Sequence, residues 1–271
     1  MSRRPYLLFS SVGDAYDAAV LSWSRGLRSR RRREYDIALV YYGDSASRYA
    51  ALAAGADRVF WSKGSKFQNL VRHLDAVAAL DYRYVWVVDD DLALAPAGIH
   101  RLFRITETFG LAASQPALSR HGEFSHAPTL ARGGWSLLRY TNFVEVNCPV
   151  LSRRALETLI PVIRPHMDLL TCWGIDILLT HHVWGPDAPF AVIDAVPVRN
   201  PHRREKRGGR RECERMDDID ALRDRWLAVR ERLRPNRPPA AVQLAQFATV
   251  RRWPFTVSTH RGTPCPSSNM R

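Results

Sequence analysis

The stretch Tyr84-Val-Trp-Val-Val-Asp-Asp-Asp-Leu-Ala-Leu94 determines how the rest of the chain is interpreted. Its first five residues are apolar or aromatic and rich in β-branched types, a composition typical of a strand buried on both faces of a mostly parallel sheet. Three carboxylates, Asp89, Asp90 and Asp91, follow directly. Three like charges side by side repel one another, and each pKa would rise unless a cation sat among them. The pattern therefore predicts a buried strand that ends at a cation.

The position of these carboxylates, at the carboxyl end of a predicted strand, indicates which kind of ligand they bind. In open α/β sheets, ligands bind just outside the carboxyl ends of the strands. Oxygen-rich sites with few protein ligands suit Mg²⁺ or Mn²⁺ carrying a phosphate group. Asp89 and Asp91 are therefore a candidate metal–diphosphate site. The alternative is an acidic turn with solvated side chains, or a cap for the following helix.

Apolar strands and helical patterns alternate on both sides of this stretch. We expect strands at residues 6–10, 37–42 and 58–61, and an amphipathic helix over 67–78. Asp14 is expected to cap a helix over residues 16–27. This alternation predicts βαβ units in a doubly wound, mostly parallel α/β sheet flanked by helices.

The pattern continues beyond the acidic stretch with a helix at residues 98–109 and strands at 142–151 and 190–196. Residues 117–136 lack periodicity and are expected to form a mobile loop over the site. Ser152 is expected to cap a helix that Pro161 bends or breaks.

The composition changes after His202, so we divide the chain into domains at 1–202 and 203–271. The second part is a helical, basic C-terminal appendage: a basic loop at 203–211, a helix from Asp217 and an irregular tail. The helix carries an apolar stripe made of Ile219, Leu222, Trp226, Val229 and Leu233. The stripe is expected to pack on the main domain, the alternative being a face that binds a partner.

Composition limits the possible classes of protein. With 271 residues, 46% hydrophobic and 25% charged, the chain is globular rather than disordered. No apolar run is long enough for a transmembrane helix, and the apolar stretch at residues 6–9 is too short for a signal peptide, so we expect a cytoplasmic protein. The four cysteines are scattered and are expected to be free thiols. We find no P-loop, Gly-x-Gly-x-x-Gly or serine-elbow motif.

The net charge of +13 is large and lies partly in two runs, at residues 28–33 and 199–211. Neither run interleaves aromatic residues as a base-stacking surface would, which argues against nucleic acid. We interpret them as solvated loops first and as peripheral contacts with an anionic membrane or polyanion second.

A series of motifs in a fixed order gives the chain a resemblance to a known family. The motifs are Ser11-Val12-Gly13-Asp14, Tyr41-Tyr42-Gly43-Asp44, Lys63-Gly64-Ser65-Lys66-Phe67-Gln68-Asn69-Leu70, Val87-Val88-Asp89-Asp90-Asp91, Ser114-Gln115-Pro116-Ala117, Thr141-Asn142-Phe143-Val144-Glu145, Pro149-Val150-Leu151-Ser152 and Trp173-Gly174-Ile175-Asp176. Over about residues 5–202 this series resembles the domain of unknown function 707 family of bacteria and plants. That family in turn resembles glycosyltransferases of the GT-A fold.

The resemblance implies a GT-A-like sheet and an Asp-x-Asp site, Asp89 and Asp91, that holds Mn²⁺ or Mg²⁺ on a nucleotide-sugar donor. His202 is in the right order to be a third metal ligand, although a lone histidine before a basic loop is more often exposed. The residues implied to line the donor site are Ser11, Gly13, Asp14, Lys66, Asn69, Asp89 and Asp90. Lys66 is a candidate phosphate ligand, the alternative being a solvated lysine at a helix start.

Two further carboxylates are candidates for catalysis. Asp176 resembles the general base that GT-A enzymes present in a Trp-Gly-x-Asp-like turn; the alternative is an ordinary aspartate stabilised by a helix N-terminus. Glu145 is expected in an apolar strand, either in a buried salt bridge or as a donor contact, base or nucleophile. His181 and His182 are expected in mid-helix, in the core or in solvent.

The resemblance thus predicts a metal-dependent glycosyltransferase acting on a nucleotide sugar and a hydroxyl acceptor, either a glycan or a small metabolite. One alternative is a nucleotidyl or sugar-phosphate transferase on a similar sheet. The other is a non-catalytic protein that binds a polyanion or a membrane surface.

Overall fold

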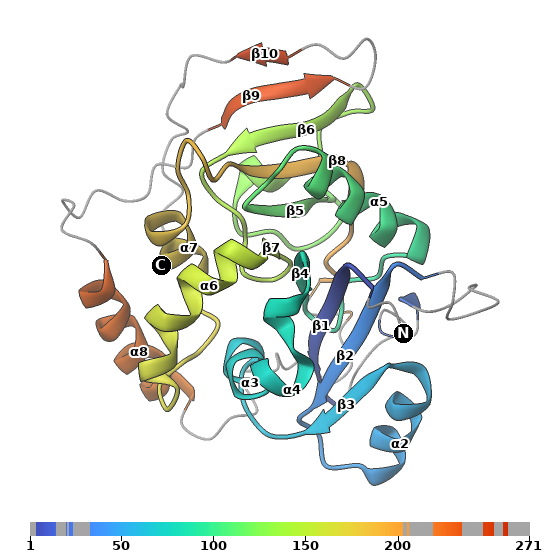
Figure 1. The fold of residues 1–271 in the computed structure, drawn as a ribbon, viewed down its shortest axis with the longest axis vertical. Helices are drawn as coiled ribbons and strands as arrows, with labels where there is room; N and C mark the ends of the chain where they lie inside the picture. The colour runs from blue at the N-terminus through green and yellow to red at the C-terminus, as the bar shows by residue number, and fades with distance from the viewer. Residues whose placement is uncertain are drawn as a thin grey trace.

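A computed structural model describes residues 4–14, 20, 22–23, 33–202, 205, 219–234, 246–251 and 257–259 (Figure 1). The strands are β1 (Tyr6–Val12), β2 (Tyr35–Tyr41), β3 (Arg58–Trp61), β4 (Tyr84–Val87), β5 (Ala113–Leu118), β6 (Ser136–Thr141), β7 (Val150–Ser152), β8 (Phe190–Val198), β9 (Gln246–Arg251) and β10 (Val257–Thr259). The helices are α2 (Ala46–Gly55), α3 (Lys66–Arg72), α4 (Leu74–Val77), α5 (Pro96–Thr108), α6 (Arg153–Ile163), α7 (Ile175–His182) and α8 (Ile219–Leu233). The helix expected over residues 16–27 and most of the two basic runs lie outside the described residues.

The described strands form one sheet in the order β10-β9-β6-β8-β5-β7-β4-β1-β2-β3 (Figure 1). Strands β3, β2, β1 and β4 pair in parallel, so their carboxyl ends lie at one edge. This half confirms the doubly wound arrangement that the alternation of strands and helices predicts.

The other half of the sheet is mixed. β5 and β8 are parallel, but β7 is antiparallel to both β4 and β5, and β6 is antiparallel to β8 and β9. The expectation of a mostly parallel sheet therefore holds only in part. Three-residue β7 joins the two halves through three residue pairs with β4 and two with β5.

Strand β4 is buried on both faces, as its apolar run predicts. Trp86 packs into one core with helix α5, whereas Val85 and Val87 pack into a second core with α3, α6 and α7. Figure 1 shows α5 on the opposite side of the sheet from α6 and α7. The carboxylates after β4 therefore stand on a strand held by two cores.

Several expected elements differ from the structure. The strand expected at 142–151 is wrong: β6 ends at Thr141, a loop follows, and only Val150–Ser152 is a strand. Strand β5 was not predicted. The helix expected over 67–78 is two helices, α3 and α4. Helix α6 begins after Ser152, as expected, and continues through Pro161 to end at Ile163.

The C-terminal residues belong to the same sheet and core. Trp226 and Val229 of α8 are buried in the core that holds α6 and α7, and Leu233 packs against that core. The expectation of an irregular tail is wrong for β9, which pairs with β6, and for β10, which pairs with β9. The division at residue 202 itself stays a prediction.

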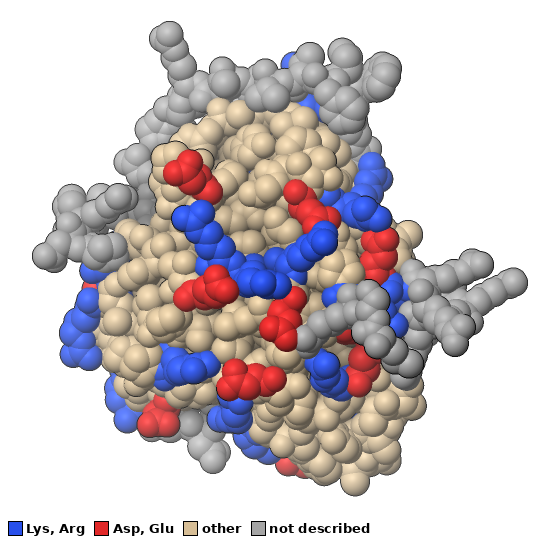
Figure 2. Space-filling view, in the orientation of Figure 1, with Lys and Arg blue, Asp and Glu red and all other residues tan. Residues whose placement is uncertain are grey.

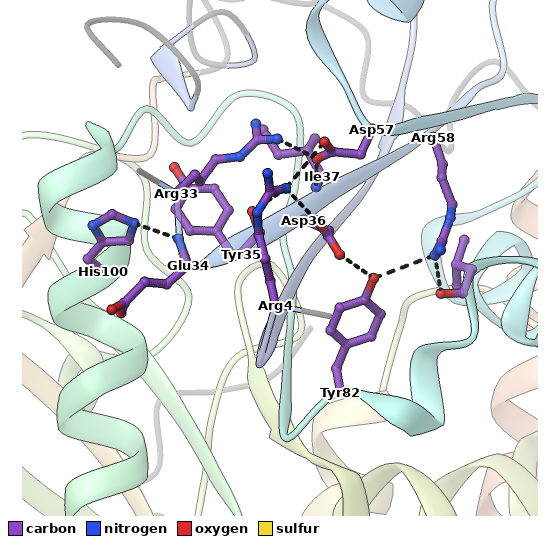
Figure 3. Close-up of polar contacts among 11 residues, drawn as sticks. Arg4, Arg33, Glu34, Tyr35, Asp36, Ile37, Asp57, Arg58, Tyr82 and His100 are labelled. Atoms are coloured by element: carbon purple, nitrogen blue, oxygen red, sulfur yellow. Dashed lines mark hydrogen bonds and ion pairs between the residues drawn. The ribbon is translucent and has the colours of Figure 1, made fainter. Parts of the chain in front are cut away.

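A polar network closes the sheet edge opposite the acidic stretch (Figure 3). Arg33, the last residue of the first basic run, is buried and pairs with Asp57, whose carboxylate also accepts the backbone N–H of Ile37 at 2.8 Å. Tyr82 donates to Asp36 at 2.7 Å. Burial lowers the pKa of Arg33, while Asp57 opposes that shift. Arg33 is thus a structural residue and not part of a solvated loop.

Helices long and apolar enough to cross a bilayer do not occur in the part of the chain that the structure describes.

Candidate active site

Asp89 lies where β4 ends, beside the loop that precedes β7. Its backbone N–H donates to Asn147 O at 2.9 Å, and its side chain, 37% exposed, pairs with the ammonium of Lys66. The carboxylate is therefore oriented from two sides while one face remains open to solvent.

Lys66 is fully buried at the start of α3. Ser65 caps that helix by accepting the Gln68 N–H, which fixes the backbone from which the lysine projects. The Lys66 ammonium has three donors. They meet Asp89 Oδ1, Val146 O at 2.9 Å and Asn147 O at 3.1 Å. Lys66 is thus not a solvated lysine, and a phosphate oxygen would have to displace one of these acceptors.

The loop after β1 meets the acidic stretch. The backbone N–H of Gly13 donates to Asp90 Oδ2 at 3.0 Å, and Asn69 Nδ2 donates to Ser11 Oγ at 2.9 Å. A Cβ on Gly13 would lie 2.5 Å from the Tyr42 ring carbon Cζ, so a larger residue there requires the Tyr42 side chain to shift. Four residues that the resemblance assigns to the donor site therefore contact one another in two pairs, Gly13 with Asp90 and Ser11 with Asn69.

Asp14 lies at the end of the same loop and is held by β2. Its carboxylate accepts the hydroxyl of Tyr41 and the backbone N–H of Asp44, the latter at 3.1 Å. These contacts link the loop after β1 to the loop after β2. The helix that Asp14 was expected to cap lies outside the described residues.

Glu145 is buried in the loop between β6 and β7, with Thr129 and Asn147 as its side-chain partners in the described part of the chain. Neither partner is a cation, so the expected buried salt bridge is not found there. Desolvation is the main cause that raises the pKa of Glu145 to about 7, and the nearby charge of Asp176 adds to it.

The Thr129 hydroxyl supports a protonated Glu145. Its oxygen lies 2.5 Å from Glu145 Oε1 and 2.7 Å from the carbonyl oxygen of His126. A hydroxyl carries one proton, and a carbonyl only accepts. An ionised Glu145 and the carbonyl oxygen of His126 compete for that one proton, whereas a protonated Glu145 supplies a second proton and satisfies both contacts.

Asp176 lies in the first turn of α7, after Gly174, whose φ of 74° lies in the left-handed region that favours glycine. Its carboxylate accepts the backbone N–H of Ile177 at 2.9 Å. Burial is the main cause that raises its pKa to about 6, opposed by the backbone N–H groups of Ile177 and Val146 and by the charge of Arg230. The expected helix start after Trp173-Gly174 is confirmed.

The segment Glu145-Val146-Asn147 connects the candidate carboxylates. The Asp89 backbone N–H and the Lys66 ammonium bind its carbonyl oxygens, its Val146 N–H lowers the pKa of Asp176, and Glu145 belongs to it. The site therefore brings Asp89, Glu145 and Asp176 to one loop.

His202 is not brought to the acidic stretch in a metal cluster. Within the residues that the structure describes, no three His, Cys, Asp or Glu side chains are grouped to hold a metal ion. His181 and His182, at the end of α7, have structural contacts: His182 contacts the carbonyl oxygen of Leu233 at 2.8 Å, and His181 accepts from Arg234 at 3.2 Å.

The segment expected as a mobile loop is anchored to the sheet. Arg139 of β6 forms a buried bidentate ion pair with Asp194 of β8, at 2.8 and 3.0 Å. Arg139 also donates to the carbonyl oxygens of Pro128 and Leu130, and Asp194 accepts the N–H of Arg132 at 2.9 Å. These contacts argue against a freely mobile loop at residues 128–132.

Sequence reasoning missed Asn147, Arg139 and Arg230. Arg139 is a lone charge between Leu138 and Tyr140, a signal that a buried partner is needed. Arg230 follows the buried Trp226 by one helical turn and so shares its face of α8. Asn147 carries no comparable signal.

Comparison with solved structures finds proteins of similar fold, whereas the comparisons of sequence find no match. The crystal structure of GalNAc-T7 with UDP, GalNAc and Mn²⁺ matches with a TM-score of 0.51 and 11% identity, covering 72% of this chain and 43% of that chain. The fold is that of the GT-A glycosyltransferases. The chain spans less than half the length of that GT-A structure, and the likeness concerns the fold alone.

A second match is TarS of S. aureus, residues 1–349, with a TM-score of 0.46, 10% identity and coverage of 84% of this chain and 71% of that chain. Neither a known family profile nor a curated protein sequence matches the chain. The resemblance to the domain of unknown function 707 family therefore stays a prediction.

Proposed function

We propose that the protein is a metal-dependent glycosyltransferase that moves a sugar from a nucleotide-sugar donor to a hydroxyl acceptor, a glycan or a small metabolite. The observation that supports this most is the convergence of Asp89, Glu145 and Asp176 on the segment 145–147 in a GT-A fold. A chain that used this fold only as a scaffold would have no need for two carboxyl groups of raised pKa at that edge.

Asp89 and Asp91 fit a divalent cation by their donor chemistry. Both are partly exposed and follow β4 directly. Mg²⁺ is commonly held by one or two carboxylates, and phosphate oxygens and water complete its shell, so a two-carboxylate site is sufficient. When bound, such a cation neutralises the charge that develops on the leaving nucleoside diphosphate. His202 as a third ligand stays a prediction, as does a cytoplasmic location with peripheral contact to an anionic membrane.

The carboxyl pair suits proton transfer. With a pKa of about 6, Asp176 is mainly ionised at neutral pH, whereas Glu145, at about 7, is partly protonated. Two carboxyl groups with separated pKa values take different roles. We assign Asp176 as the general base, and Glu145 as the group that contacts the donor sugar.

The reaction then balances as follows. The acceptor oxygen forms a bond to the anomeric carbon while the bond from that carbon to the diphosphate oxygen breaks. The electron pair of the broken bond leaves on the nucleoside diphosphate, and Asp176 takes the acceptor's hydroxyl proton. Ser11, Gly13, Asp14, Asn69 and Asp90 are proposed to line the nucleotide.

The two alternatives lack a specific observation in their favour. Nucleotidyl transfer would release pyrophosphate instead of a nucleoside diphosphate, which product analysis distinguishes. Binding of a polyanion needs a surface of one sign, and the one face drawn in Figure 2 mixes Lys and Arg with Asp and Glu, so the described residues of that face offer no such surface.

The test is a screen of UDP, GDP, CMP and ADP, each with and without Mn²⁺, by thermal shift and calorimetry. A ligand at about 100 times its Kd stabilises the folded state by about 2.7 kcal/mol. We expect one nucleotide to bind only with metal, EDTA to reverse it, and Asp91→Asn to abolish it. Asp187→Asn, at an exposed turn, is the matched control. Absence of binding by every nucleotide under every metal condition contradicts the proposal.

A further inference from the structure

Helix α8 comes from the basic C-terminal region, which the proposed function leaves without a role, yet it packs on the turn that carries Asp176. The indole N–H of Trp226 donates to Trp173 O at 2.7 Å. The guanidinium of Arg223 lies over the Trp173 ring, 5.6 Å from its centroid. Trp226 is fully buried, so this contact is part of the core and not a surface association.

Arg230, one helical turn after Trp226, lies against Gly174. A Cβ added to Gly174 would lie 2.5 Å from Arg230 Cδ, so the arginine would have to shift, and the positive φ of this residue independently favours glycine. The Arg230 side chain is 16% exposed, and one of its terminal nitrogens pairs with the neighbouring Glu231. The arginine thus lies directly over the turn that precedes Asp176.

The Nε of Arg230 is buried and has no hydrogen-bond acceptor within the described part of the chain. A buried donor without a partner costs free energy, so its retention calls for an explanation. The charge of Arg230 offers one, because it lowers the pKa of Asp176 against the effect of burial. Two carboxylates also act on the pair: Glu145 interacts with Asp176 from the loop before β7, and Glu231 pairs with Arg230.

We propose that Arg230 is a positioning residue of the active site: it holds the Trp173–Asp176 turn and supplies the positive charge that favours the ionised, proton-accepting form of Asp176. Helix α8 is then a required part of the acceptor side of the site. This inference rests on the proposed function, in which Asp176 is the general base.

The test compares Arg230→Met, which keeps the aliphatic bulk, with Arg230→Lys, which keeps the charge. The control is Arg232→Met, an exposed arginine of the same helix. The acidic limb of the pH profile of kcat/KM reports the pKa of the base in the free enzyme. In Arg230→Met we expect this limb to move up by about one pH unit.

Asp176 with a pKa of about 6 is half ionised at pH 6, so a rise of about one unit should lower the activity of Arg230→Met at pH 6 about fivefold, with recovery towards the wild-type rate at pH 8. Arg230→Lys and Arg232→Met should keep the wild-type limb. A purely structural role would lower the rate at every pH without moving the limb, and that result overturns the proposal. An equal shift of the acidic limb in Arg232→Met would also overturn the proposal.

A second measurement separates this inference from the proposed function. The carboxyl titration of Asp176 is followed by ¹³C NMR in full-length protein that carries Glu145→Gln, because coupled carboxyl groups titrate as a pair. Asp176→Asn identifies the resonance. If no donor supports turnover, the proposed function fails, while a higher Asp176 pKa in Arg230→Met still supports the role of Arg230. An unchanged titration overturns it.

Discussion

The ion pair between Lys66 and Asp89 joins a fully buried cation to a carboxylate that is 37% exposed. The same ammonium binds the carbonyl oxygens of Val146 and Asn147, so one residue of α3 connects the end of β4 to the loop that carries Glu145. Asp89 therefore has a compensating positive charge built into the protein, and a metal ion would add to it.

Removal of that cation should destabilise the protein. Lys66→Met removes the cation paired with Asp89 and the ammonium donor to Val146 O, and leaves Asn147 O with the Asp89 N–H alone, so we expect a loss of about 3 kcal/mol of unfolding free energy. Lys63→Met is the control, since Lys63 and its partner Asp44 are 65% and 83% exposed; exposed pairs contribute about 0.5 kcal/mol. Urea unfolding of both variants measures the two losses of unfolding free energy. Equal losses in Lys66→Met and Lys63→Met would contradict the structural role of Lys66.

The Arg139–Asp194 pair should matter for the loop above the site. Asp194→Asn leaves the buried guanidinium without its counter-charge, and we expect a loss of about 3–5 kcal/mol. Amide exchange of Arg132, which donates to Asp194, should also accelerate. The surface variant Asp220→Asn, on an exposed pair with Arg223, should change neither quantity. Retained protection of Arg132 in Asp194→Asn would show that other contacts fix the loop.

Glu145 should make stability depend on pH. Its pKa is raised from 4.5 to about 7 in the folded protein, so the folded state binds the proton more tightly than the unfolded state. Stability from this group is then fully present below pH 4.5 and is lost as pH rises through 7.

Glu145→Gln mimics the protonated group, because its amide N–H can donate to Thr129. We expect it to match the wild type at pH 4.5 and to exceed it at pH 8 by about 2–3 kcal/mol. Denaturant titrations of both proteins between these pH values test this. Parallel stability curves would mean that folding leaves the pKa of Glu145 near 4.5, so that the group is ionised at neutral pH, and the hydrogen-bond argument at Thr129 would be wrong.

The C-terminal region should be required for folding. A chain that ends at residue 202 lacks Trp226, whose removal from a core costs about 3–5 kcal/mol, and lacks the strand that pairs with β6. Since domains are stable by about 5–15 kcal/mol, we expect no cooperative unfolding from the shortened chain. Near-ultraviolet circular dichroism and urea titration measure this. A cooperative transition would support residues 1–202 as an independent domain.

The parts of the fold that were predictable are those whose local pattern and tertiary environment agree. Strand β4 was predicted because five apolar residues need burial on both faces, which two cores provide. The start of α7 was predicted from Trp173-Gly174-Ile175-Asp176, where a glycine supplies the positive φ.

Strand β5 was missed because its sequence, Ala-Ser-Gln-Pro-Ala-Leu, has no β-branched residue and contains Pro116. A proline removes a ladder hydrogen bond and is tolerated at irregular positions. The register of β5 with β8 shifts between Pro116 and Ala117, which is such a position. The strand exists because of its neighbours, which no local pattern reveals.

The candidate site was predictable in its residue types but not in its contacts. Asp89, Glu145 and Asp176 were identified by position, whereas the roles of Lys66 and Arg230 depend on segments brought together from α3, α8 and the loop before β7. Lys66 faces three protein acceptors, an arrangement that depends on residues about 80 positions away.

The short strand β7 affects which substitutions this protein can accept as it evolves. Only two residue pairs connect β7 to β5, so the two halves of the sheet meet there along their shortest seam. Side-chain contacts at Glu145 supplement that seam: its backbone N–H donates to Gln115 Oε1 of β5 at 2.6 Å, and its carboxyl group meets Thr129. The residues proposed for the chemistry thus also connect the two halves. A substitution that alters specificity at this loop is expected to loosen the sheet, so new activities are expected to require a second, stabilising change elsewhere.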